Sequence, residues 1–233
     1  MFPDQPARPG DAFLGEEFGG HGRSRRRWIV DAIDGTASFI AGEPEWGTLI
    51  ALVDHGTTTM GVVSAPACHR RWWAAHATGS WTSTLPNDTT TSPSRLAITG
   101  AAELHQAVIG IWPPPTRLSA RDRSIAADLA SRAGQTRPAI DWQATQAPAP
   151  PIRKPSTGSG TCHGALLVAT GQLDAFLLLG AGAWDIAALI PIVQEAGGTY
   201  SDLSGSQNVD TGAALFANAA LHRQILDIAG RTS

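Results

Sequence analysis

The segment Trp28–Thr36 constrains this chain more than any other part of it. It reads W-I-V-D-A-I-D-G-T, so an apolar run leads into two carboxylates and a Gly-Thr pair. The apolar run indicates the end of a short buried strand. In a tightly turned segment, the spacing of three can aim Asp31 and Asp34 at one point, and convergent carboxylate oxygens suit Mg²⁺. Gly35 lets the backbone approach an anion, so the segment predicts a metal site beside a phosphate-sized nest.

Composition narrows the classes of function. The chain has 233 residues, 42% of them apolar, and a net charge of −3. That charge provides no basic field, so nucleic acid is not a favoured partner. No apolar run reaches membrane-spanning length, and the N-terminus does not resemble a secretory signal. Two cysteines are too few for a disulfide framework, so we expect reduced thiols in a cytoplasmic protein; a homodimer is compatible with the sequence.

Hydrophobic periodicity and breaker residues predict a mixed α/β chain. We expect short strands at 13–17, 47–53, 59–65, 71–77, 96–99, 107–111, 173–179, 199–203 and 213–217. Strands 47–53, 59–65 and 71–77 should form an antiparallel meander. We expect helices at 119–133 with Ser119 as the cap, and at 158–170, 183–196 and 219–229. We expect loops at 19–27, 78–94 and 138–155.

Three motifs in order carry a resemblance to a known family. Gly15-Glu16-Glu17 is similar to a G-E-E motif, Asp31–Thr36 to D-P-I-D-G-T, and Trp184–Ala188 to W-D-x-A-A. Together they resemble the inositol monophosphatase superfamily. The run from Gly61 to Ala75 is closest to its histidinol-phosphate phosphatase branch of actinobacterial type.

The resemblance implies a layered α/β sandwich of the inositol monophosphatase/fructose-1,6-bisphosphatase type. Its N-terminal half would span residues 1–112 and carry the first two motifs. A Pro-rich connection would span 113–157, and a C-terminal α/β half would span 158–233.

The resemblance also implies a site for two or three Mg²⁺ ions and a small phosphorylated metabolite. The metal ligands would be Glu16, Asp31, the Ile33 carbonyl, Asp34 and Asp185. Asp34, Gly35 and Thr36 would hold the phosphate, Glu16 and Thr36 would act in catalysis, and Thr161 and Leu178 would occupy substrate-binding positions.

Three side-chain groups have a second interpretation. Asp185 begins a helix and could be only an N-terminal cap. The arginines between Arg23 and Arg27 could face an anionic substrate or belong to a solvated loop. The start of the helix at Gly158–Thr161 could contact substrate or simply cap the helix. No supporting pattern accompanies Cys162-His163, so thiol catalysis is not expected.

The sequence also departs from the family pattern. The family begins with a helix pair carrying a T-x-x-D motif whose aspartate partners the threonine of D-G-T, and this chain starts just ahead of Gly15. Leu178 stands where a substrate-binding glutamate is common, and Thr161 where histidinol-phosphate phosphatases have an aspartate. We therefore expect Mg²⁺-dependent hydrolysis of a phosphomonoester such as histidinol, inositol or sugar phosphate; the alternative is a catalytically impaired metal-binding or interaction relative. Without that helix pair, one face of a sheet would be uncovered, and its exposed apolar surface should favour self-association.

Overall fold

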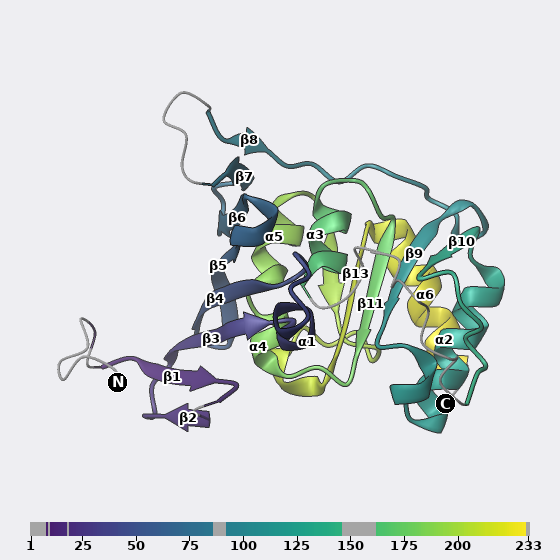
Figure 1. The fold of residues 1–233 in the computed structure, drawn as a ribbon, viewed down its shortest axis with the longest axis horizontal. Coiled ribbons are helices and arrows are strands. Elements are labelled where there is room, and N and C mark those ends of the chain that lie inside the picture. The colour runs from purple at the N-terminus through teal and green to yellow at the C-terminus, as the bar shows by residue number, and fades with distance from the viewer. Residues whose placement is uncertain (1–7, 9, 18, 86–91, 146–161, 232–233) are drawn as a thin grey trace.

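The computed structural model describes residues 8, 10–17, 19–85, 92–145 and 162–231. Two β-sheets organise these residues, with helices between the sheets and on the far side of the second sheet (Figure 1). Within the described residues, every helix is too short or too polar to cross a membrane. The layered α/β architecture agrees with the expected fold class, whereas the division into halves at 112 and 158 stays a prediction.

The first sheet has eight strands in the order β2-β1-β3-β4-β5-β6-β7-β8. Their bounds are β1 Ala12–Gly15, β2 Gly19–His21, β3 Arg26–Asp34, β4 Gly47–Asp54, β5 Thr57–Ala65, β6 Arg70–Ala75, β7 Ser80–Thr84 and β8 Ser94–Arg95. β1 runs parallel to β3, and all other neighbours are antiparallel. The predicted meander of β4, β5 and β6 is confirmed.

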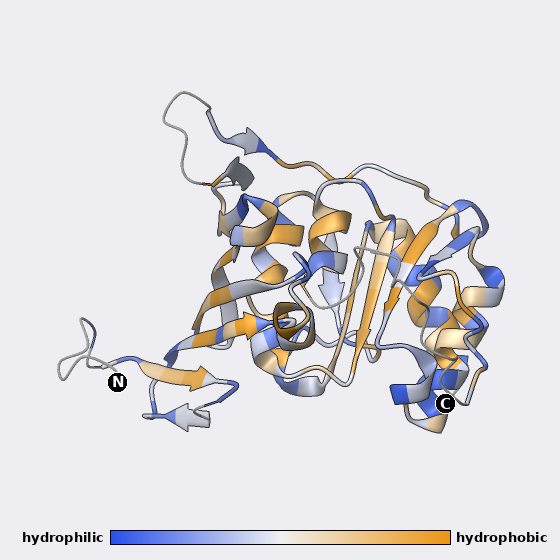
Figure 2. Cartoon of the chain, viewed as in Figure 1, coloured by the Kyte–Doolittle hydropathy of each residue, from blue (hydrophilic) through white to orange (hydrophobic). Residues whose placement is uncertain are grey.

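The second sheet has five strands in the order β10-β9-β11-β13-β12. Their bounds are β9 Val108–Trp112, β10 Gln135–Arg137, β11 Ala175–Leu179, β12 Thr199–Ser201 and β13 Ala213–Ala217. β11 is buried along its whole length because helices cover both faces of this sheet. Figure 2 shows the matching apolar colouring along β9 and β11.

Six α-helices lie within the described residues. They are α1 Thr36–Ile40, α2 Ala120–Arg132, α3 His163–Ala169, α4 Ala183–Ile186, α5 Leu189–Glu195 and α6 Ala219–Arg231. Ser119 caps α2 as predicted, since its hydroxyl oxygen accepts a 3.1 Å hydrogen bond from the Asp122 N–H. Asn218 does the same for α6 through the amides of Ala220 and Leu221.

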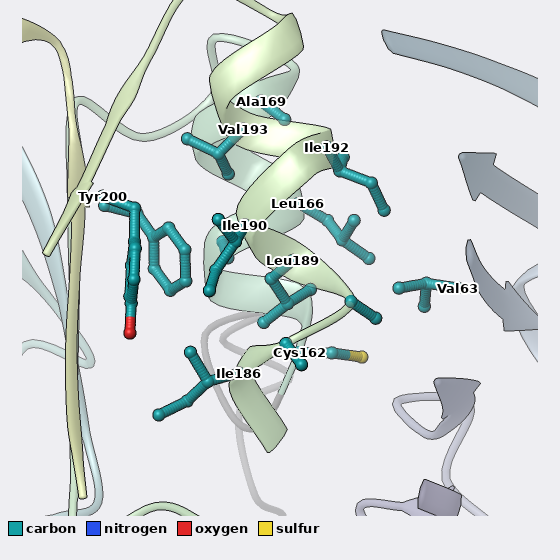
Figure 3. Close-up of a cluster of buried hydrophobic side chains, with 14 of the residues drawn as sticks. Val63, Cys162, Leu166, Ala169, Ile186, Leu189, Ile190, Ile192, Val193 and Tyr200 are labelled. Carbon is teal, nitrogen blue, oxygen red and sulfur yellow. The ribbon is translucent and has the colours of Figure 1, made fainter. Parts of the chain in front are cut away.

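The main core lies between the two sheets, around α3, α4 and α5. Figure 3 shows Leu166, Leu189 and Ile192 of these helices packed toward Val63 of β5. Gly61 of β5 lies against the junction between α4 and α5, where an added Cβ would overlap the Ala188 carbonyl oxygen. A second core cluster fills the space between the second sheet and helices α2 and α6.

The outer face of the first sheet carries half-buried apolar side chains. One cross-strand row, here called the outer row, consists of Val30, Ile50, Val62, Trp73 and Trp81. Successive side chains of a strand point to opposite faces, so Trp72 is buried and its neighbour Trp73 lies on this other face. Among the described residues, α4 and α5 pack on the inner face of this sheet only, so the outer row has no helix over it.

Four predicted elements differ from the structure. β2 lies in the predicted 19–27 loop, where its backbone pairs with β1, and β7 and the first residue of β8 lie in the predicted 78–94 loop. No strand covers 96–99; there the Leu96 N–H donates to the Ser80 carbonyl of β7 and the Ile98 N–H to the Ala196 carbonyl. The predicted 183–196 helix is two helices, since Pro191 has no N–H to offer the carbonyl of residue 187.

Candidate metal centre

The candidate metal centre lies where β3 ends and α4 begins. Asp31, Asp34 and Asp185 each offer one carboxylate oxygen, and these oxygens all lie within 4.8 Å of one another. Asp31 is 1% and Asp34 4% exposed, so two of the three carboxylates are withdrawn from water. The structure therefore brings together three of the residues that the sequence singled out.

A β-bulge explains how Asp31 and Asp34 converge. Asp31 pairs with Leu49 and Asp34 with Gly47, so three residue steps on β3 match two on β4. In a regular strand, side chains three positions apart point to opposite faces. The extra residue of the bulge restores both aspartates to the same side.

One oxygen of the Asp31 carboxylate is available to a cation. Its Oδ1 accepts a 2.9 Å hydrogen bond from the Ile33 N–H. Its Oδ2 is buried and has no hydrogen-bond partner among the described residues. A buried carboxylate oxygen without a donor is costly, and a hard divalent cation would satisfy it.

Backbone amides hold the other two aspartates. The Cys162 N–H donates a 2.8 Å hydrogen bond to Asp34 Oδ2, and the Gly182 N–H donates a 2.7 Å hydrogen bond to Asp185 Oδ2. Asp185 thus interacts with the start of α4 and also faces the centre, so its two interpretations are compatible. In Asp34 and in Asp185, a hydrogen bond from a backbone N–H thus orients a carboxylate that also belongs to the group of three convergent aspartates.

The carboxylates alter one another's protonation. Burial, followed by the charges of Asp34, Glu16 and Asp185, raises the pKa of Asp31 to about 8. Burial also raises the pKa of Asp185 to about 6, although the Gly182 N–H opposes this shift. Without a cation, Asp31 therefore holds a proton at neutral pH, and a bound divalent cation would reverse that preference.

Glu16 lies beside this group rather than inside it. Gly15 of β1 pairs with Val30 of β3, so Glu16 follows at the level of Asp31. Partial desolvation and the charges of Glu17 and Asp34 raise the pKa of Glu16, and an interaction with Asp31 partly offsets them. Its side chain is exposed at the edge of the centre. Its roles as ligand and catalytic residue stay predictions.

The Gly-Thr pair forms a left-handed turn into α1. Gly35 has φ of +81°, a conformation that favours glycine, and it precedes the first helical residue Thr36. The Thr36 hydroxyl donates a 2.9 Å hydrogen bond to the Ile33 carbonyl. That carbonyl keeps a second lone pair for a metal. No carboxylate among the described residues accepts a hydrogen bond from Thr36.

The remaining predicted positions lie elsewhere. Leu178 is 4% exposed in β11 and belongs to the main core, and Thr161 lies outside the described residues. Arg26 pairs with Asp54 at 3.8 Å and Arg27 with Asp210 at 3.2 Å, so these arginines do not converge on the acidic centre.

Two contacts of the centre were not anticipated from the sequence. They are the Cys162 amide on Asp34 and the Thr48 hydroxyl, which donates a 2.8 Å hydrogen bond to the Ala32 carbonyl in the bulge. The available signal for the second contact was a hydroxyl residue inside the apolar run Gly47–Val53.

Comparison with known proteins assigns the family. The model of the inositol monophosphatase family matches residues 5–230. The chain belongs to the inositol monophosphatase family. Membership agrees with the three motifs and with the convergence of Asp31, Asp34 and Asp185. An acidic group of this kind is consistent with a metal-dependent family.

Two similar relatives from this family are histidinol-phosphatases. The one from Mycobacterium tuberculosis is 37% identical over 220 residues, which cover 94% of this chain and 75% of the relative. The one from Streptomyces coelicolor is 33% identical, with the same coverage of both chains. Among solved structures, an inositol monophosphatase from Zymomonas mobilis superposes with a TM-score of 0.76 at 24% identity, covering 96% of this chain and 77% of that one. This last similarity supports the fold alone.

Proposed function

We propose that this chain is a Mg²⁺-dependent phosphomonoester hydrolase with histidinol phosphate as its leading candidate substrate. The observation that carries the proposal is the unpartnered, buried Oδ2 of Asp31 within a group of three convergent aspartates. The family membership supports the reaction class, and the histidinol-phosphatase relatives support the substrate.

The residues of the candidate site would have separate roles in binding the cation and the phosphate. Asp31, Asp34 and Asp185 would hold the cation, joined by Glu16 and the Ile33 carbonyl. Mg²⁺, when bound, polarises phosphoryl oxygens and lowers the pKa of a coordinated water. The backbone N–H groups that follow Gly35 would orient the phosphate and stabilise its charge. The Thr36 hydroxyl lies at the same turn, where it can orient a water molecule.

The two positions expected to contact the substrate's organic part carry no acid. Histidinol phosphate carries an ammonium group, and an acid would be the natural partner for it. Leu178 offers an apolar side chain in the core instead, and the other expected position is the uncharged Thr161. Inositol and sugar phosphates are therefore close competitors.

A second function is favoured by one specific observation. The Thr36 hydroxyl donates its hydrogen bond to the Ile33 carbonyl, and among the described residues no carboxylate accepts a hydrogen bond from it. General base catalysis typically contributes about 10²–10⁴-fold to a rate. Without such a partner, the chain would bind metal and phosphate but turn over slowly, as a catalytically impaired relative.

Phosphate release separates the two functions. We would incubate the purified chain with histidinol phosphate and Mg²⁺, with EDTA and an Asp31→Asn variant as negative controls. Asp54→Asn is the matched control, since that carboxylate lies at the far end of β4. We expect metal-dependent release that Asp31→Asn abolishes and Asp54→Asn retains. Metal binding without release would support the impaired relative, and release unaffected by Asp31→Asn would refute the assigned site.

A further inference from the structure

The bulge that positions Asp31 and Asp34 is held by a residue outside the acidic group. Ala32 and Ile33 have no cross-strand partner in the β3–β4 pairing. The Thr48 hydroxyl of β4 takes the place of a ladder donor and bonds the Ala32 carbonyl at 2.8 Å. This is the side-chain bond through which β4 anchors the bulge.

The Ala32–Ile33 peptide connects Thr48 to Asp31. The peptide unit is planar, and its C=O and N–H point in opposite directions. Its oxygen end accepts from the Thr48 hydroxyl, and its N–H end donates to Asp31 Oδ1 at 2.9 Å. Fixing the oxygen end therefore fixes the direction of the N–H, and two bonds in series polarise one another.

This series decides which Asp31 oxygen is available. Oδ1 is occupied by the Ile33 N–H, so the unpartnered Oδ2 is the atom presented to a cation. We propose that Thr48 is a positioning residue of the metal centre, which orients the Asp31 carboxylate through the Ala32–Ile33 peptide. The inference rests on the proposed metal site and deepens it. Thr48 itself touches neither cation nor substrate.

A purely structural role for Thr48 predicts different results. If its hydroxyl only strengthened the β3–β4 pair, its loss would lower stability equally with and without metal. A positioning role predicts loss of metal affinity beyond any change in metal-free stability. Outer partners of metal ligands typically contribute about 10–100-fold in metal affinity.

The test compares three variants of the whole chain. Thr48→Val removes the hydroxyl at constant shape, and Thr48→Ser keeps it. Thr59→Val is the matched control, since the Thr59 hydroxyl donates to the Leu52 carbonyl at 3.2 Å in the same sheet, away from the bulge. Mg²⁺ affinity is measured by calorimetry, and the exchange rate of the Ile33 amide by NMR on the metal-free chain.

We expect Thr48→Val to weaken Mg²⁺ binding about tenfold and to speed exchange of the Ile33 amide, whereas Thr48→Ser and Thr59→Val stay within about twofold of the wild type. Equal Mg²⁺ affinity in Thr48→Val and wild type overturns the inference while leaving the proposed function intact. If the wild type binds no Mg²⁺, the proposed function fails, and the inference fails with it because it rests on the metal site.

Discussion

The backbone N–H of Cys162 donates a 2.8 Å hydrogen bond to Asp34 Oδ2 across 128 positions of sequence. Asp34 ends β3 in the first sheet, and Cys162 stands directly before α3, which packs against the second sheet. The candidate metal centre thus lies where the two sheets approach each other. Its geometry depends on how residues of both sheets pack.

Removing the Cys162 amide should weaken metal binding. Cys162 has φ of −60°, which a proline can adopt while losing its N–H. We expect Cys162→Pro to reduce Mg²⁺ affinity at least about tenfold, because a hydrogen bond to a charged group contributes about 1.5–3 kcal/mol. Calorimetry measures the affinity. Cys162→Ala removes the thiol and keeps the amide, so equal affinities of the two variants would contradict the prediction.

The metal-free chain should lose stability as the pH rises. The pKa of Asp31 goes from 3.8 to about 8 on folding, so the folded chain binds more protons than the unfolded chain between these values. The free energy of unfolding should therefore fall by about 1.4 kcal/mol for each pH unit while this carboxyl titrates.

Thermal unfolding in EDTA between pH 5 and pH 8 measures this slope. Asp31→Asn should flatten it, since an amide has no proton to lose. Saturating Mg²⁺ should also flatten it, because the cation takes the place of the proton. A slope that is unchanged in Asp31→Asn would mean that other groups cause it.

Substrate selectivity should be low. Neither Leu178 nor Thr161 supplies a negative charge for a substrate ammonium or imidazolium group. We expect kcat/KM for histidinol phosphate within about tenfold of values for neutral polyol or sugar phosphates, a difference of about 1.4 kcal/mol. Phosphate release from a panel of such esters measures it. A thousandfold preference for histidinol phosphate would show that another residue recognises its cationic part.

The outer row should promote self-association of the chain as it stands. Val30, Ile50, Val62, Trp73 and Trp81 are neighbours on one sheet face, and contiguous apolar patches associate in water. We expect the double variant Ile50→Thr/Val62→Thr to shift light scattering toward the monomer. These threonines keep the strand propensity. A wild-type chain that is already monomeric would refute the prediction.

Local pattern was enough for the parts of the fold that depend on local chemistry. The near-continuous apolar run Gly47–Val53 predicted β4, and Ser119 predicted the start of α2. The polar segment containing β7 was assigned to a loop, because its strand character comes from pairing with β6 rather than from its composition. The break between α4 and α5 depends on a single missing N–H, that of Pro191.

The candidate site was predictable to a similar degree. Residue type and spacing indicated Asp31 and Asp34, the family resemblance added Asp185, and these carboxylates do converge. The bulge that brings Asp31 and Asp34 to the same side of β3 could not be predicted from the sequence, because it is defined by the pairing with β4. The contributions of Thr48 and the Cys162 amide depend on tertiary contacts, and an amide donor has no signature in residue type.

Gly61 couples the packing of the first sheet to the position of Asp185. It lies under Ala188, three positions after Asp185, and there is no room for even a methyl group between β5 and the α4–α5 junction. A side chain at position 61 would displace that junction and carry Asp185 away from Asp31 and Asp34. The absence of a side chain at one position of the sheet thus sets where a carboxylate of another layer lies, so a substitution at Gly61 should disturb the candidate metal centre without altering any of its ligands.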